Sequence, residues 1–468
     1  MENQLDIKKI LLVVPITHTH YVTPPIGLGY LAAALRQNKF SNIYILDCLK
    51  EGVSYDKLRQ YFKELKAYLV GFQVFSSNLD SVIKSIDILK QECPGTIVIV
   101  GGPHISATKT EALEEIKLAD FGFMGEAEDS LPLLAKRLIN FERIALEDIP
   151  GLIWREDGVV RMNPGIFINN LDRLAFPSWD LMPPEDYPDN PQGVFYKNFP
   201  IAPIITTRGC PYACTFCGSG VNMGKKLRLR SIKNVLDEMD ILYRDFGVRE
   251  FHIIDDMFNF YKERVLEFCQ GIKQRNWKIS YTFPNGIRLN HLDREMLQEM
   301  KETGLYAFTV GVESGSQRML YAMKKNLSLE LIEDKINLIN SIGIEPSGFF
   351  IIGYPGERVE DIQATIKFAK KLKLKRAHFS NFLPLPGTEA TNRLLENKEI
   401  DKLSYASLAY SKVPYSPRGI TKIQLKGLQR RAFLEFYLRP RTLLKLFAEI
   451  KSYNHFKMFL KRIFDYLL

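Results

Sequence analysis

The stretch "RGCPYACTFCGSG", residues 208–220, contains Cys210, Cys214 and Cys217, which are three of the six cysteines in a chain of 468 residues. Thiols at the spacing Cys-x3-Cys-x2-Cys can serve a disulfide, a zinc site or an iron-sulfur cluster. The N-terminus shows no signal peptide, so we expect a reducing, cytoplasmic setting, which disfavours a disulfide.

Structural zinc takes four ligands, commonly from two Cys-x2-Cys pairs, and no second pair or nearby His accompanies this loop. Electron-transfer clusters normally take four thiolates. A loop with three thiols holds three corners of a 4Fe-4S cubane and leaves the fourth iron without a protein ligand. The spacing therefore indicates chemistry at an open iron rather than simple electron relay.

With Phe216 before the last cysteine, the loop resembles the signature of the radical S-adenosylmethionine superfamily. In that family S-adenosylmethionine chelates the open iron. Transfer of one electron then cleaves S-adenosylmethionine and gives a 5'-deoxyadenosyl radical. The resemblance makes Cys210, Cys214 and Cys217 the metal ligands and catalytic residues. Arg208 either offsets the charge of the cluster or is a solvated charge at a strand end.

The chain after this loop alternates short apolar runs with amphipathic stretches. The runs are residues 250–256, 279–288, 306–316, 346–357 and 376–389. Together with the strand before the cysteines they predict six βα units, a partial (β/α)6 TIM-type barrel whose site lies at the carboxyl ends of the strands.

The same resemblance places S-adenosylmethionine contacts at strand ends and in the cysteine loop. They are Phe216, Asp255, Asp256, Arg288, Glu313, Ser314, Gly353 and Pro355. Glu313 would contact the ribose, or it forms a salt bridge at the barrel end. Arg288 would meet the carboxylate of S-adenosylmethionine, or it forms a structural ion pair.

The N-terminal part predicts an open α/β fold with a parallel, Rossmann-like sheet. Its strands are expected at residues 8–15, 43–47, 67–75, 96–102 and 121–126. No G-x-G-x-x-G motif opens the first helix and no Walker lysine is present, which disfavours a nucleotide site.

This region resembles the cobalamin-binding domain that precedes many radical S-adenosylmethionine enzymes. The residues expected to contact cobalamin are Thr23, Pro25, Gly27, Leu28, Ser76, Ser77, Gly101, Gly102, His104, Gly125 and Glu126. The Asp-x-His-x-x-Gly loop that ligates cobalt from below is absent, although His18 and His20 lie near its place. We therefore expect no histidine beneath the cobalt, and His104 either contacts the cofactor or caps a strand end.

We expect four parts: a cobalamin-binding domain at 1–140, a hairpin turned at Asp157-Gly158 with a linker at 141–199, the barrel at 200–395, and a basic helical region at 396–468. No apolar run approaches the ~20 residues that span a bilayer. Cys48, Cys93 and Cys269 are expected to be buried and inert. His252 and His378 are expected to be satisfied core residues rather than proton carriers.

The formal net charge is +9, and residues 419–468 hold eleven Lys or Arg against three acids, a net charge of +8. The rest is nearly neutral, so no nucleic-acid partner is expected. The basic, aromatic tail either lies on an anionic membrane, at the inner face, which would fit a lipid-like substrate, or packs on its own protein.

The favoured function is cobalamin-dependent C-methylation of an unactivated carbon in a small molecule. Its cofactors would be a 4Fe-4S cluster, S-adenosylmethionine and cobalamin, and the electron donor a flavodoxin or ferredoxin. The main alternative is a radical cyclase, oxidoreductase or rearrangement enzyme in which cobalamin carries electrons or is absent. A tRNA methylthiotransferase would bring a second cysteine set, and a corrinoid carrier would not need the three cysteines.

Overall fold

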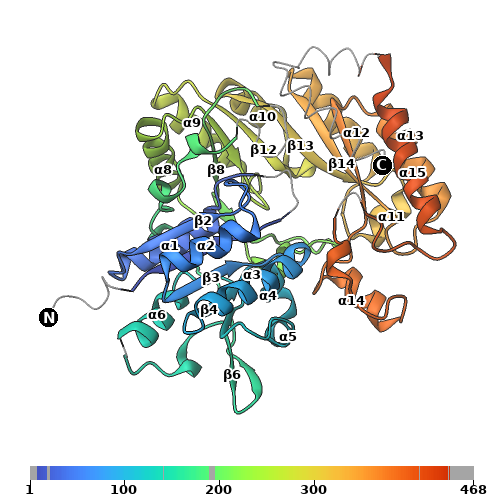
Figure 1. Cartoon of the computed structure of the whole chain (residues 1–468). Coiled ribbons are helices and arrows are strands. Elements are labelled where there is room, and N and C mark those ends of the chain that lie inside the picture. Colours follow the sequence, from blue (N-terminus) through green and yellow to red (C-terminus); the bar gives the residue numbers. More distant parts are fainter. Residues whose placement is uncertain are drawn as a thin grey trace. The chain divides into compact units, whose positions relative to one another are not determined.

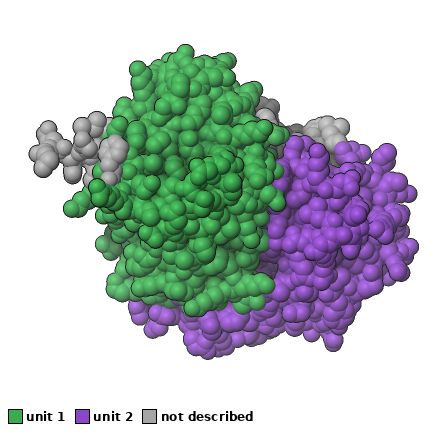
Figure 2. Space-filling view, turned by 90° about the horizontal axis from the view of Figure 1, so that it is seen from below, with its two compact units in different colours: residues 1–211, 218–251 green, residues 212–217, 252–468 purple. Residues whose placement is uncertain are grey.

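The computed structural model describes residues 8–17, 22–140, 142–188, 196–409, 412–440 and 442. The chain divides into two compact units (Figure 2). The first contains residues 1–211 and 218–251, and the second contains 212–217 and 252–468. His18 and His20 lie outside the described residues.

The first unit is built on a seven-stranded sheet of order β2-β1-β3-β4-β5-β6-β7 (Figure 1). Its strands are β1 (Ile10–Val14), β2 (Ile43–Asp47), β3 (Leu69–Gln73), β4 (Ile97–Gly101), β5 (Phe121–Phe123), β6 (Leu152–Glu156) and β7 (Val159–Met162). The first five pair in parallel, which confirms the predicted α/β sheet. Because the strand order reverses between β1 and β3, the carboxyl ends of these two strands flank the crevice where such sheets bind ligands.

The helices between these strands follow the expected alternation. They are α1 (Ile26–Gln37), α2 (Tyr55–Leu65), α3 (Leu79–Glu92), α4 (Pro103–Thr108), α5 (Thr110–Glu115) and α6 (Ser130–Asn140). Leu28 and Leu35 of α1 share a buried core with Leu131 and Leu134 of α6 and with Leu12 of β1. One face of the sheet is therefore closed by α1 and α6.

Strands β6 and β7 form the predicted antiparallel hairpin. Its turn residues Asp157 and Gly158 have φ values of 50° and 79°. Two consecutive positive φ values are typical of a type I′ turn, which explains why an Asp-Gly pair stands there.

The second sheet has six strands in the order β15-β14-β13-β12-β11-β8. They are β8 (Ile201–Ile204), β11 (Glu250–Ile253), β12 (Ser280–Ile287), β13 (Leu305–Glu313), β14 (Glu345–Ile352) and β15 (Arg376–Asn381). Neighbours in the sheet are neighbours in sequence, and β12 to β15 pair in parallel. This is the predicted partial barrel.

The helices that follow these strands complete the βα units. They are α8 (Ile232–Asp245), α9 (Lys262–Gln274), α10 (Arg294–Glu302), α11 (Gln317–Ala322), α12 (Leu329–Ser341), α13 (Val359–Lys371) and α14 (Glu389–Glu396). A two-stranded ribbon, β9 (Thr207–Arg208) with β10 (Arg228–Leu229), and the short helix α7 (Ser219–Asn222) flank the cysteine loop.

The basic C-terminal region begins with α15 (Lys422–Tyr437), which packs on the protein itself. Gln429 donates a hydrogen bond to the Phe379 carbonyl, and the Tyr437 hydroxyl donates one to the Ala377 carbonyl, both on the edge strand β15. The prediction of a membrane contact falls mainly on residues 443–468, outside the described residues. Within the described part of the chain, every helix is too short or too polar to cross a bilayer.

The linker is held against α1 at Gly29. The Gly29 carbonyl accepts a hydrogen bond of 3.1 Å from the Ser178 amide. A Cβ at Gly29 would lie 2.1 Å from Met182 Cε and 2.9 Å from Pro177 Cβ. Position 29 therefore has to be glycine for the linker to approach so closely.

We predict that Gly29→Ala lowers the free energy of unfolding by about 1–3 kcal/mol, because the overlap outweighs the ~1 kcal/mol by which Ala favours a helix. Denaturant unfolding of the cofactor-free protein measures this. Gly27→Ala on the same helix is the control, since its Cβ would meet no atom within 4 Å. Equal destabilisation by the two changes would contradict the prediction.

Candidate functional site

The cysteine loop starts at a sharp backbone turn. Gly209 has φ +85°, and a Cβ there would lie 2.4 Å from the Lys226 carbonyl oxygen. The next amide, of Cys210, donates a hydrogen bond of 3.2 Å to the Gly224 carbonyl. The glycine of the "RGC" sequence thus lets the chain leave β9 and turn back against the 223–226 segment.

Thr215 anchors the middle of the loop in the second unit. Its amide donates to the Met323 carbonyl at 3.1 Å, its carbonyl accepts from the Ala390 amide at 2.9 Å, and its hydroxyl lies 2.6 Å from the Tyr354 hydroxyl. Phe216 packs against the apolar cluster that contains Met323 and Tyr354. Sequence reasoning missed Thr215, although its place between two cysteines was a usable signal.

All six cysteines are reduced thiols in this structure. Cys210 and Cys214 are half-buried and Cys217 is exposed. No group of three or more Cys, His, Asp or Glu side chains within the described ranges is arranged to hold a metal ion. The loop nevertheless supplies three thiols within eight residues, which are the type of donor that an iron-sulfur cluster takes.

Arg288 lies beside one of these thiols. Its Nη1 donates to Cys214 Sγ at 3.8 Å, and its guanidinium lies 3.6 Å from the centroid of the Tyr212 ring. Its backbone carbonyl and amide are both bonded to the Asn259 side chain. A fixed cation at this place offsets the negative charge of a thiolate-bound cluster, which supports the fit of the loop to that cofactor.

Glu313 ends β13 in a strained conformation. It has φ +64°, and the pairing with β14 shifts register there. Its carboxylate is 6% exposed and lies 2.6 Å from Lys325 Nζ. A Cβ at Gly311 would lie 2.3 Å from the Glu313 carboxylate. Backbone strain of this kind clusters at functional sites, and the observed ion pair is the alternative that the sequence left open.

The carboxyl edge of the first sheet offers open backbone. A Cβ added at Gly27, Gly101 or Gly125 would meet no atom within 4 Å. Gly102 and Gly125 have φ values of +111° and +78°. A large planar cofactor can therefore approach the main chain closely at this edge, so the residues fit a corrinoid.

His104 is fully buried and bonded through both ring nitrogens. Nδ1 lies 2.9 Å from Ser76 Oγ, and Nε2 lies 3.0 Å from the Glu115 carboxylate. Its side chain has no exposed surface. Through these two bonds it links the loop after β3 to α5. Its predicted contact with cobalamin remains a prediction, as does that of Ser77.

The Glu126 carboxylate forms salt bridges with two arginines. One carboxylate oxygen lies 2.7 Å from Arg228 Nη1 and accepts the Ile168 amide at 2.7 Å, and the other lies 3.3 Å from Arg208. Arg208 is 5% exposed, so it is not the solvated charge that the sequence allowed. Sequence reasoning missed these pairs because their members are about 80 to 100 positions apart.

Protein-family comparison matches residues 12–135 to the B12 binding domain and residues 204–369 to the radical SAM superfamily. The chain is 31% identical over 448 residues to the uncharacterized methyltransferase PH0819 of Pyrococcus horikoshii, a match that covers 94% of this chain and 95% of that protein. This chain belongs to the cobalamin-dependent radical S-adenosylmethionine methyltransferases. The predicted class of enzyme and its three cofactors are thereby confirmed.

Other relatives of this methyltransferase show the range of the family. Cytidylyl-2-hydroxyethylphosphonate methyltransferase of Streptomyces wedmorensis is 29% identical, with 81% of this chain and 79% of that protein covered. The anaerobic magnesium-protoporphyrin IX monomethyl ester cyclase of Cereibacter sphaeroides is 24% identical, covering 89% and 67%. The solved structure of the cobalamin-dependent radical enzyme OxsB has the same fold, with a TM-score of 0.76, 16% identity and coverage of 97% and 72%.

The remaining predicted contacts of the methyltransferase lie at the expected strand ends. Asp255 is buried and Asp256 is exposed after β11. The buried Ser314 hydroxyl lies 3.1 Å from the Thr365 hydroxyl. Pro355 follows β14, and Thr23, Pro25 and Leu28 precede or open α1. Their assignment to cofactors remains a prediction.

Cysteines and histidines outside the loop mostly follow expectation. Cys48 and Cys269 are buried, whereas Cys93 is only half-buried and its thiol donates to the Phe62 carbonyl at 3.5 Å. His252 is buried, and His378 is half-buried with its ring 5.3 Å from that of Phe349.

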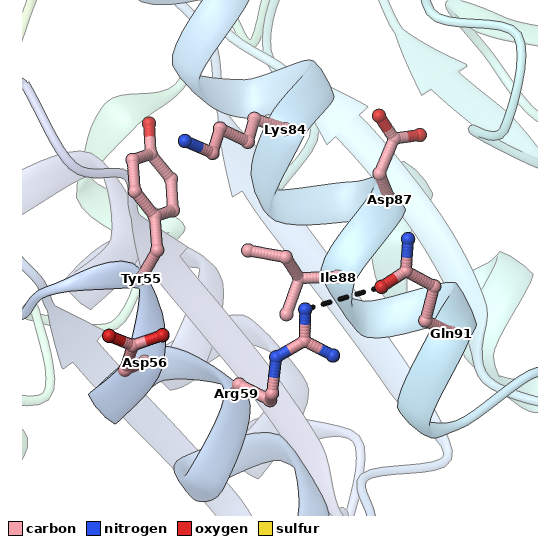
Figure 3. A pocket seen from close by; sticks show the side chains of 7 residues that line it. All are labelled: Tyr55, Asp56, Arg59, Lys84, Asp87, Ile88 and Gln91. Atoms are coloured by element: carbon pink, nitrogen blue, oxygen red, sulfur yellow. Dashed lines mark hydrogen bonds between the residues drawn. The ribbon is translucent and has the colours of Figure 1, made fainter.

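A hollow of about 360 Å³ opens between α2 and α3 (Figure 3). Tyr55, Asp56, Arg59, Lys84, Asp87, Ile88 and Gln91 line it. Arg59 pairs with Glu92, and Lys84 lies over the Tyr55 ring. These residues lie on two helices and none stands at a strand end, so we assign the hollow no part in cofactor binding.

Glu357 is a buried carboxyl that shapes the Gly353 turn. It is 1% exposed and accepts the amides of Gly353 and Tyr354. Burial raises its pKa from 4.5 to about 8, so it is protonated at neutral pH. On the other side of the turn, a Cβ at Gly353 would lie 2.5 Å from Leu425 of α15.

Because the pKa of Glu357 is raised on folding, the stability that it contributes is complete below pH 4.5 and is lost as the pH rises towards 8. We predict that the wild type loses up to about 2.7 kcal/mol more than Glu357→Gln between pH 6 and pH 8, the equivalent of one proton over two pH units. Urea unfolding at several pH values measures the two slopes. Parallel pH profiles of the two proteins would contradict this pKa.

Proposed function

We propose that this enzyme transfers a methyl group to an unactivated carbon of a small molecule, with its cluster held by Cys210, Cys214 and Cys217. One observation carries the proposal: a three-thiol loop, fixed by Thr215, belongs to a chain whose first sheet presents open glycine backbone at its carboxyl edge. Three thiolates leave an iron for S-adenosylmethionine, and the open edge suits a corrinoid. When bound, the cluster supplies the electron that cleaves S-adenosylmethionine, and cobalamin carries the methyl group.

We assign the binding of S-adenosylmethionine to residues of the barrel and the loop. Glu313 binds the ribose hydroxyls in place of part of its contact with Lys325, and its strained backbone directs the carboxylate. The adenine is contacted by Gly353, Pro355 and the backbone of Phe216. The rest of the S-adenosylmethionine molecule is contacted by Asp255, Asp256 and Ser314. Arg288 holds the thiolate of Cys214 and attracts the carboxylate of S-adenosylmethionine.

We assign the corrinoid contacts to the edge of the first sheet. The macrocycle is admitted at Gly27, Gly101 and Gly125, and Gly102 supplies the turn beside Gly101. Its approach is lined by Thr23, Pro25, Leu28, Ser76 and Ser77. His104 acts indirectly, because both of its ring nitrogens are bonded to protein groups. It fixes the Ser76 hydroxyl, so we expect no cobalt ligand from it.

The enzyme needs an external electron donor and a small-molecule substrate. For the donor we propose a flavodoxin or ferredoxin. For the substrate we propose a lipid-like molecule, because the basic, aromatic region after α15 has the composition of segments that lie at a membrane surface.

We predict that changing Cys210, Cys214 and Cys217 together to Ala abolishes cluster absorbance and lowers the reductive cleavage of S-adenosylmethionine by at least ~100-fold, because no thiolate remains to hold iron. The protein reconstituted with cluster and cobalamin is incubated with dithionite and methyl-deuterated S-adenosylmethionine, so that cobalamin can accept the methyl group, and 5'-deoxyadenosine and S-adenosylhomocysteine are quantified by mass spectrometry. Cys93→Ala is the control and should retain both the cluster absorbance and the cleavage of S-adenosylmethionine.

Two outcomes contradict the proposal. Equal cleavage by the triple variant would exclude the loop as the cluster site. If the cobalamin-loaded wild type forms 5'-deoxyadenosine but neither S-adenosylhomocysteine nor deuterated methylcobalamin, the protein is a cyclase or oxidoreductase instead.

A further inference from the structure

Two arginines lie side by side on the ribbon that leads into the cysteine loop. Arg208 of β9 pairs in register with Arg228 of β10. Both side chains are almost completely buried, with 6% and 2% of their surface exposed. Two neighbouring buried cations are unstable unless acids lie against them.

The acids come from the loop between β5 and α6. Glu128 lies 2.7 Å from Arg208 Nη2, and Glu126 lies 2.7 Å from Arg228 and 3.3 Å from Arg208. Their side chains are 8% and 3% exposed. Two cations and two anions make a neutral buried group, the Arg–Glu quartet. The two acids also outweigh the effect of burial on Arg208 and raise its pKa.

The quartet joins two places that matter for the reaction. Glu126 follows Gly125 directly, at the carboxyl end of β5, where the corrinoid is expected. Arg208 stands two residues before the cluster ligand Cys210. Arg228 also donates to the Met223 carbonyl at 2.8 Å and so braces the segment whose Gly224 carbonyl accepts the Cys210 amide. All of these residues belong to the first compact unit.

The exposed ion pairs of this unit cannot serve the same purpose. Arg36 and Asp180 pair with 37% and 58% of their side chains exposed, and Arg173 and Asp129 with 48% and 32%. Exposed pairs contribute little because water and salt screen them. Breaking a buried pair leaves an uncompensated charge, so the quartet holds its two segments much more firmly.

We propose that Glu126 and Glu128 are positioning residues, which fix β9, the strand that leads into the Cys210 loop, to the carboxyl edge of the cobalamin sheet. The first cluster ligand and the cobalamin edge then move as one body, which keeps the cleavage of S-adenosylmethionine coupled to methyl transfer. The coupling of cleavage to methyl transfer rests on the proposed function, whereas the fixing of β9 by the two acids does not. Glu126 thereby acts through Arg208 and Arg228 rather than by contact with the corrinoid.

Glu128→Gln tests the fixed strand in the cofactor-free protein, because it removes one charge and keeps the shape. Hydrogen exchange in peptides that span residues 205–212 should become about tenfold faster or more, since Arg208 loses one of its two acids. Peptides from β1 and β3 should not change. Asp129→Asn, one residue further along, breaks only an exposed pair and should leave all of these peptides unchanged.

Glu128→Asp shortens the side chain but keeps its charge, so its exchange should fall between those of the wild type and Glu128→Gln. If Glu128→Gln does not fold, Glu128→Asp takes its place with an expected increase of about threefold. Unchanged exchange at residues 205–212 in a folded variant overturns the proposal. Loss of bound cobalamin with unchanged exchange also overturns it, because the acids would then contact the corrinoid.

The loaded enzyme tests the coupling. Glu128→Gln should retain its cobalamin and iron, while the ratio of 5'-deoxyadenosine to S-adenosylhomocysteine, the co-product of methyl transfer to cobalamin, rises at least ~3-fold, because a displaced strand wastes cleavage events. An unchanged ratio overturns the coupling. If the cobalamin-loaded wild type makes no S-adenosylhomocysteine, the proposed function fails, whereas the exchange experiment still decides whether the quartet fixes the strand.

Discussion

The parallel pairing of strands is the constraint on which the functional arrangement of this chain depends. In each sheet, parallel neighbours bring their carboxyl ends to one edge, so residues that are distant in sequence meet there. In the first sheet, Gly101 ends β4, and Gly27 and Gly125 come after β1 and β5. In the second sheet, Glu313 ends β13 and Gly353 follows β14. The loops at those edges carry the chemistry, and the strands position them.

Charge inside the protein explains the next level of organisation. A buried carboxylate needs a cation, amide donors or a proton, and the chain uses each of these solutions. Glu126 and Glu128 face arginines, Glu313 faces Lys325, and Glu357 keeps its proton between two amides. Glu126 follows Gly125, Glu313 precedes Ser314, and Glu357 accepts the Gly353 amide, so three of these acids contact or adjoin residues expected to touch a cofactor.

Local patterns in the sequence predicted much of this protein. Apolar runs at strand spacing predicted both parallel sheets, the Asp157-Gly158 pair predicted the hairpin, and the Cys-x3-Cys-x2-Cys spacing predicted the class of enzyme. Contacts between distant positions were not predictable in this way. Thr215 with Tyr354, Gly29 with Met182, and Arg208 with Glu128 depend on how the folded segments meet.

Sequence by itself determined the chemistry, because ligand type and spacing within one short loop limit which cofactor can bind. It also determined the order of strands and helices, because apolar periodicity is a local property. Only the tertiary structure decided which charged residues pair with each other. Arg208 and Glu126 have the same side chains whether or not they pair, and burial of both within reach of one another makes them an ion pair.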